Sequence, residues 1–146
     1  MFIAQVTNAD SLPSLQATIQ FAAQRHALIT HNIANLNTPN YEPVDVDPRS
    51  FQRQLGEAID RRRTRFGGHR GDLNITSSRE VAQDGRGRLQ LRPRASGQGI
   101  LYHDRNNRDL ERTMQDLVEN AGVFRVATEL LRSRVDILNT AIRERL

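Results

Sequence analysis

The sequence predicts an all-α protein built on two long helices that are joined by an irregular segment. Two observations carry this expectation. Apolar residues recur in alternating steps of three and four near both ends of the chain, and glycine and arginine crowd the middle. Such steps, sustained over several heptads, are typical of a coiled coil. We therefore expect a single domain over residues 1–146, with helices over 11–36 and 107–146 packed as an antiparallel coiled coil. The irregular middle is expected to span 37–106.

The N-terminal helix is predicted by a seam of residues with unbroken three- and four-residue spacing. Asp10 or Ser11 suits the N-cap, and Pro13 fits the first turn, where its missing N–H costs little. Phe21, Ala23 and Leu28 lie beside the seam and widen the apolar stripe, so we expect this helix to contact neighbouring chains as well. The seam also contains His26, and its residues assigned to packing and assembly are Leu12, Leu15, Ile19, Ile29, Ile33 and Leu36.

The C-terminal helix has the clearest pattern, with four- and three-residue steps sustained over more than four heptads. Thr128 is the one polar residue in this seam, and its methyl group can still pack. Glu111 in the first turn and Arg143 in the last complement the helix dipole. At about 1.5 Å per residue the helix would be about 60 Å long. The seam residues assigned to packing and assembly are Leu110, Met114, Leu117, Phe124, Leu131, Val135, Leu138 and Ile142.

The middle is expected to hold at most a short helix and a small β element. A short helix is predicted around Phe51–Arg62, because apolar residues recur there every four positions. Pro48 can open this helix, and Gly67 follows its basic end. Repeated glycines favour loops elsewhere. Short strands are predicted within three stretches, DLNITSS at 72–78, GRLQLRP at 87–93 and GILYHD at 99–104.

The charge of the chain is concentrated in its middle. The net charge is +4, all 21 basic residues are arginine, and residues 49–108 hold fourteen arginines and six acids, a net charge of +8. The clusters RRRTR at 61–65 and GRGRLQLRPR at 85–94 allow two interpretations: docking on acidic partners or neighbouring subunits, and binding of nucleic acid. Aromatic residues that would stack on bases are nearly absent nearby, which favours protein docking.

The sequence lacks the patterns of catalytic and metal sites. It has no cysteine, no G-x-S-x-G elbow, no P-loop and no H-E-x-x-H helix, and its four histidines lack metal-ligand spacing. Asp45 and Asp47 alternate as a possible carboxylate pair, although a loop role with arginine partners fits them better. We therefore expect no enzyme activity, cofactor, metal or small-molecule substrate. No apolar run approaches the ~20 residues of a membrane-spanning helix, and no secretory signal is expected in the first ten residues.

The string HNIANLNTPNY at 31–41 predicts a helix that ends in a stiff turn. Pro39 disfavours helical geometry at Thr38 and blocks continuation. Asn37 and Asn40 can satisfy or mimic the backbone bonds of a turn, and asparagine tolerates the left-handed conformation better than other non-glycine residues. Tyr41 is expected to hold the outgoing chain against an apolar surface. The turn is therefore predicted to give the chain a fixed exit angle.

This string resembles the N-terminal signature of bacterial flagellar axial proteins, the rod and hook family. Asparagine at position 40 stands where that family usually has glycine. The chain is short and lacks a large inserted domain. Its C-terminal segment, from Asn106-Asn107 onward and including Asn120, resembles the terminal helix of FlgB-type proximal rod proteins, and LNITSSREV resembles a mid-chain stretch of them. The matching signature residues are Asn32, Ile33, Ala34, Asn35, Asn37, Thr38, Pro39 and Tyr41.

The resemblance implies a structural subunit that self-assembles into the proximal rod of the flagellar basal body. It implies that the rod crosses the periplasm, transmits torque and lines an export channel, and that the subunit leaves the cell interior through the type III apparatus without a cleaved signal. The implied partners are further copies of the chain, rod proteins of the FlgC and FlgF types, the FliE-type adaptor and the MS-ring region. The alternatives are another rod paralogue, of the FlgC type, and a basic nucleic-acid-binding protein.

Overall fold

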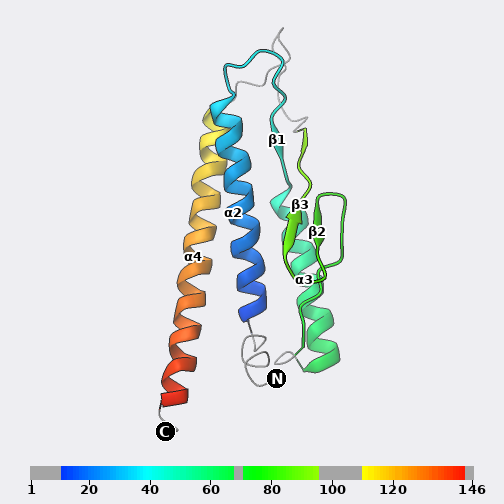
Figure 1. Cartoon of the computed structure of the whole chain (residues 1–146), viewed down its shortest axis with the longest axis vertical. Coiled ribbons are helices and arrows are strands. Elements are labelled where there is room, and N and C mark those ends of the chain that lie inside the picture. The colour runs from blue at the N-terminus through cyan, green and yellow to red at the C-terminus, as the bar shows by residue number, and fades with distance from the viewer. Residues whose placement is uncertain (1–10, 68–70, 96–109, 144–146) are drawn as a thin grey trace.

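The structure, a computed structural model, describes residues 11–67, 71–95 and 110–143. The described chain is mostly helical, and α2 and α4 lie side by side and antiparallel, as expected (Figure 1). The third helix and the strands lie on the other side of α2. The helices are α2 (Leu12–Ala34), α3 (Pro48–Phe66) and α4 (Leu110–Arg143). The strands are β1 (Val44–Asp45), β2 (Val81–Gln83), β3 (Leu89–Leu91) and β4 (Arg94–Ala95).

The two long helices have nearly the predicted bounds. Ser11 occupies the N-cap position of α2, although its side chain makes no capping hydrogen bond, and proline lies in the first turn. The last helical residue is Ala34, two positions before the predicted end. The chain tightens there, because the Leu36 N–H donates to the Ile33 carbonyl, three residues back, at 3.2 Å. In α4, Glu111 and Arg143 lie in the first and last turns, as predicted.

The helix of the middle is longer than the sequence suggested, with 19 residues from Pro48 to Phe66. Its ends have the expected signals. The Asp47 carboxylate accepts the N–H groups of Arg49 at 3.0 Å and Ser50 at 3.2 Å, and Pro48 follows it. At the other end Gly67 adopts a left-handed φ of 68°, which glycine does without strain. The helix predicted around Phe51–Arg62 is therefore confirmed, and it extends beyond both predicted ends.

The hydrophobic core lies between α2 and the middle of the chain. The rings of Phe21 on α2 and Phe51 on α3 stack with centroids 4.1 Å apart and planes 3° apart. Leu28 packs against the same core. Phe21 and Leu28, which lie beside the α2 seam, therefore pack within the chain, whereas Ala23 is exposed. A contact of this helix with neighbouring chains stays a prediction. None of the buried residues of this cluster comes from α4; they are Ala17, Phe21, Val46, Phe51, Ala58, Leu73, Ile75, Val81 and Leu89.

The strands form two antiparallel pairs, β2 with β3 and β1 with β4. The strand predicted within 87–93 is confirmed by β3. The one predicted at 72–78 is wrong, because that stretch is extended without a strand partner. Its backbone bonds to a side chain: Gln83 accepts the Ile75 N–H at 2.8 Å and donates to the Leu73 carbonyl at 3.2 Å. The stretch 99–104 lies outside the described residues.

Glutamines of α2 complete the hydrogen bonding of β3. The Gln20 side chain accepts the Leu89 N–H at 3.0 Å, and Gln24 donates to the Leu89 carbonyl at 2.8 Å. Gln24 also accepts the Leu91 N–H at 3.2 Å. Backbone groups at a strand edge need partners, and here α2 provides them. The middle is thus fastened to α2 by both apolar packing and side-chain hydrogen bonds.

Candidate functional site

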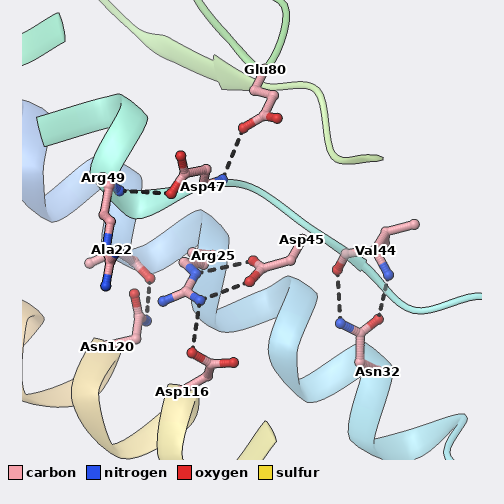
Figure 2. A network of polar contacts seen from close by, with 10 residues as sticks. All are labelled: Ala22, Arg25, Asn32, Val44, Asp45, Asp47, Arg49, Glu80, Asp116 and Asn120. Carbon is pink, nitrogen blue, oxygen red and sulfur yellow. Dashed lines mark hydrogen bonds and ion pairs between the residues drawn. The ribbon is translucent and has the colours of Figure 1, made fainter. Parts of the chain in front are cut away.

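The exit from α2 is closed by the side chain of Asn32, a residue of the signature string. Its Nδ2 donates to the Val44 carbonyl at 2.8 Å, and its Oδ1 accepts the Val44 N–H at 3.1 Å (Figure 2). An amide that donates and accepts in this way substitutes for one residue of a paired strand. The chain that leaves α2 is therefore turned back and held alongside the helix at β1.

The turn itself has the left-handed residue that the sequence predicted. Asn40 has a φ of 58°, and it is the one non-glycine residue with a positive φ among the described residues. The Thr38 N–H donates to the Asn35 carbonyl at 2.9 Å, and the Tyr41 N–H donates to the Thr38 carbonyl at 3.3 Å. Asn35 also caps the helix end, since its Nδ2 donates to the His31 carbonyl at 2.9 Å. Successive tight turns thus fix the exit.

Tyr41 holds the outgoing chain, although through polar contacts rather than the apolar surface that we expected. Its hydroxyl donates to Asn32 Oδ1 at 2.8 Å and lies 2.8 Å from His31 Nδ1. The two rings are tilted, with centroids 5.6 Å apart. Burial raises the pKa of the Tyr41 phenol, so the hydroxyl stays protonated and remains a donor. The Tyr41 hydroxyl therefore ties the outgoing chain to the last turns of α2.

A buried ion cluster joins α2 to both neighbouring regions. Arg25 on α2 is only 4% exposed. Its Nε and one terminal nitrogen bind the two oxygens of Asp45 at 3.1 and 2.7 Å, and the same terminal nitrogen lies 3.2 Å from Asp116 on α4 (Figure 2). Burial alone would lower the pKa of the guanidinium, but hydrogen bonds and attraction from Asp45, with a smaller contribution from Asp116, raise it. The preference for an arginine partner at Asp45 is confirmed, whereas Asp47 caps α3.

The contact between α2 and α4 includes a buried asparagine and a buried alanine of α4 beside half-buried leucines. Asn120, which is buried, donates from Nδ2 to the Ala22 carbonyl at 2.8 Å (Figure 2). The buried residues of α4 are Asn120 and Ala127, which lie seven positions apart on one face. Each lies one position before a residue of the predicted seam, and one position is about 100° of rotation. The most buried positions of α4 therefore lie beside the seam, although Leu117, Leu131 and Leu138 of the seam are half-buried as well.

The seam of α4 is consequently split between a covered edge and an open one. Leu117, Leu131 and Leu138 are half-buried, while five other seam residues are 39–51% exposed. The open residues are Leu110, Met114, Phe124, Val135 and Ile142. On the N-terminal helix, Leu12 and Ile29 are buried, and Leu15, Ile19, Ile33 and Leu36 are half-buried, whereas His26 is exposed.

Large apolar side chains are left exposed along α4. Across the side chains that the structure describes, every large apolar residue left exposed lies on this helix. Besides the open edge of the seam, the set contains Val118, Val123, Val126, Leu130 and Ile137. A helix that is apolar on most sides is typical of one that other elements cover. Within the chain α2 covers one side only.

The arginine cluster at 61–65 is used partly inside the chain. Arg61 donates to the Asn74 carbonyl at 3.3 Å and to Thr76 Oγ1 at 2.9 Å, and Arg62 is buried. Arg61 therefore helps to fix the extended stretch against α3. Arg63 is exposed and lies 3.9 Å from Asp60. Docking on acidic partners by this cluster stays a prediction, now restricted to its exposed members.

An open groove of about 680 Å³ runs beside the ion cluster, between α2, β1 and the start of α4. Both arginines and carboxylates line it, so the groove carries charges of both signs. Among them are Glu80, Arg94 and Arg112. Over the described ranges 11–67, 71–95 and 110–143, no group of three His, Asp or Glu residues is arranged to hold a metal ion. None of the helices described there is long and apolar enough to cross a membrane.

Sequence reasoning missed the roles of Arg25, Asp116 and Asn120. Each is a single polar residue on an otherwise amphipathic helix, and periodicity alone treats such residues as solvent-facing. The available signal was position: Arg25 precedes the seam residue at 26, and Asn120 precedes the one at 121. Both therefore flank a predicted packing face. The signature residues Ala34, Asn37, Thr38 and Pro39 lie at the exposed rim of the exit.

Exposed large apolar residues along one helix, as on α4, are typical of a surface that another protein covers. No protein-family model matches the chain. The chain is 28% identical over 123 residues to the flagellar basal body rod protein FlgB of Borrelia hermsii, and the alignment covers 82% of this chain and 85% of that protein. The resemblance to FlgB-type rod proteins, inferred from the signature string and the C-terminal segment, is confirmed by this similarity.

Proposed function

We propose that this chain is a structural subunit that self-assembles into the proximal rod of a bacterial flagellar basal body, with no enzymatic role. Similarity to a FlgB rod protein supports the flagellar assignment. The observation that carries self-assembly is the position of the exposed large apolar residues, all on α4 among the described side chains. Seven-residue repeats along that surface suit another helix better than a small molecule.

Burial of the open face supplies the driving force for assembly. Complete burial of a Leu, Val, Ile or Phe side chain stabilises by about 1.5–3 kcal/mol, so a residue that is half exposed contributes about 1 kcal/mol when covered. The open face extends along a 34-residue helix, about 50 Å in length. A helix–helix interface of that length can supply the area that stable protein complexes need, about 1,000 Å² in total.

Polar contacts within the chain give the assembly its geometry. Arg25 and Asn120 fix the position of α4 on α2, and Asn32 fixes the exit of the chain at the end of α2. Every copy therefore presents the open face at the same angle. A heterologous contact repeated at a fixed angle gives a ring or an open helix. Such a tube would transmit torque along its helices and enclose an export channel.

The remaining parts of the proposal follow from the flagellar assignment. The subunit would reach the periplasmic rod through the type III apparatus without a cleaved signal. Its partners would be further copies of itself, rod proteins of the FlgC and FlgF types, the FliE-type adaptor and the MS-ring region. The exposed arginines of the middle, such as Arg63, would meet acidic surfaces of these neighbours.

A charge placed on the open face tests self-assembly. Val135→Asp adds a carboxylate where we expect an apolar contact, and Val135 is 42% exposed, so the single chain should fold normally. We expect loss of oligomers in sedimentation and loss of motility in cells that carry only this variant. Circular dichroism of the dilute protein should be unchanged.

Ser133→Asp is the matched control, because it adds the same charge two positions away on an exposed polar residue. We expect it to assemble and to support motility. If Val135→Asp and Ser133→Asp assemble equally well, the open face is not the assembly surface.

A further inference from the structure

The exposed apolar residues of α4 lie on both sides of its contact with α2. Successive residues of an α-helix are about 100° apart around its axis, and directions can be measured from the buried Asn120. The open edge of the seam lies about 40–120° to one side. A second stripe lies about 60–120° to the other side, and it consists of Val123, Val126, Leu130 and Ile137. A helix that packs on one of the two therefore leaves the other open.

The outer side of α4, which faces away from α2, has a basic row and an acidic row of exposed side chains. The basic row borders the open edge of the seam at about 120–140° from Asn120, and it consists of Arg125, Arg132 and Arg143. The acidic row follows at about 160–180°, toward the second stripe, and it consists of Glu111, Glu129 and Asp136. Val118, the remaining exposed large apolar residue, is in line with the acidic row. The two stripes therefore have unlike surroundings.

Small side chains separate the acidic row from the second stripe. Gly122, Ser133 and Thr140 lie there, about 140–160° from Asn120 on the side of that stripe. A shallow hollow of about 620 Å³ opens at this place, and its lining includes Ser133, Thr140 and the carboxylate residues Glu129 and Asp136. A long arginine side chain from a neighbouring helix can cross the hollow and reach these carboxylates. The second stripe therefore has room beside it for the basic row of another α4.

We propose that the open edge of the seam on one copy packs against the second stripe of the next copy, so that each α4 lies between two others. Among the described side chains, every large apolar residue left exposed is on α4, so a second copy offers its apolar surface there. Contact between two seam edges, with α2 on the same side of both helices, would set the basic rows against each other. Contact between unlike stripes instead brings the basic row of one copy to the acidic row of the next.

A contact between unlike faces leaves one stripe free at each end of a pair. It can therefore repeat until a ring closes or a helical tube grows, while α4 keeps its position on α2. This pairing rests on the self-assembly in the proposed function, and it names the two surfaces that meet.

Disulfide trapping tests the pairing, since the chain has no cysteine of its own. Val135→Cys marks the open edge of the seam, and Val126→Cys, Leu130→Cys and Ile137→Cys mark three levels of the second stripe. Each variant is oxidised alone, and Val135→Cys is also mixed with each of the others, at a concentration where sedimentation shows oligomers. The Val135→Cys chain carries a tag, so that a mixed dimer differs in mass from a dimer of either variant.

We expect at least one mixture to give on the order of 10-fold more mixed dimer than dimer of either variant, since a disulfide needs Cα atoms within about 7 Å. Oligomers without mixed dimers, or with dimers mainly of Val135→Cys, would overturn the pairing and leave self-assembly standing. If no concentration gives oligomers, self-assembly itself fails, and the pairing fails with it.

Charge reversal provides a second measurement that needs no disulfide. Arg125→Glu with Arg132→Glu makes the basic row acidic, and Glu129→Arg with Asp136→Arg makes the acidic row basic. We expect each double variant to need on the order of 10-fold more protein for assembly, and an equal mixture of the two to assemble like the original chain. Circular dichroism checks that each dilute variant keeps its helix content. A mixture that assembles no better than its components would overturn the pairing.

Discussion

Two regions flank α2, and they meet it through different chemistry. The middle meets it with stacked phenylalanine rings and with glutamines that bond to a strand edge. The C-terminal helix meets it with an arginine–carboxylate pair, a buried asparagine and three half-buried leucines, while its other large apolar residues are exposed. The difference teaches that one side of α2 is built to fold the chain. The other side holds a helix that is covered along one edge and leaves ten large apolar residues exposed.

A phenylalanine truncated in each region gives the largest expected contrast. Phe51→Ala removes a core ring and should lower the free energy of unfolding by about 3–5 kcal/mol. Phe124→Ala removes an exposed ring of α4 and should cost about 1 kcal/mol or less, yet weaken assembly. Urea denaturation followed by circular dichroism measures both, with sedimentation for assembly. Similar losses of stability in the two variants would erase the distinction between the regions.

The ion cluster gives an intermediate contrast, because Arg25 has one carboxylate partner from each region. Asp45→Asn disturbs two hydrogen bonds that hold the middle, and we expect it to cost about 1–2 kcal/mol in the free energy of unfolding. Asp116→Asn disturbs one longer contact to a more exposed carboxylate, and we expect about 0.5 kcal/mol or less. Thermal unfolding of the two isosteric variants compares them. A larger loss from Asp116→Asn would show that α4 is the more firmly attached region.

The exit turn between α2 and the middle gives the smallest expected effect. Asn40 has a left-handed φ of 58°, so Asn40→Ala should cost about 1 kcal/mol through backbone strain. Asn40→Gly removes that strain and should change the free energy of unfolding by less than about 0.5 kcal/mol. Calorimetry at fixed concentration measures the difference. Equal melting temperatures for the alanine and glycine variants would mean that the turn is not held in this conformation.

Local signals in the sequence were sufficient for the helices and for the exit. The three-four spacing predicted both long helices, Pro48 and Gly67 marked the ends of α3, and asparagine at 40 indicated a left-handed turn. These features depend on residues that are close together in the chain. Local backbone preferences therefore decide them.

The core, and the element that covers the apolar face of α4, could not be predicted in this way. The stack of Phe21 on Phe51 joins segments thirty residues apart, and the sequence pattern of neither segment indicates that the two pack together. A heptad pattern shows which face of a helix is apolar, but not which element covers it. Asn120 and Arg25 contribute polar contacts between α2 and α4, and a hydrophobic pattern does not predict such contacts.

Side-chain accessibility in assembled rods tests the central claim most directly. Val135→Cys places a thiol on the open face of α4, and Ser77→Cys places one at an exposed position of the middle. Both thiols are alkylated in the dilute protein and in rods isolated from cells that carry the variant. We predict that assembly protects the thiol at 135 and leaves the one at 77 reactive. Protection at 77 with an unprotected thiol at 135 would contradict the account, because the middle and not α4 would then carry the assembly contact.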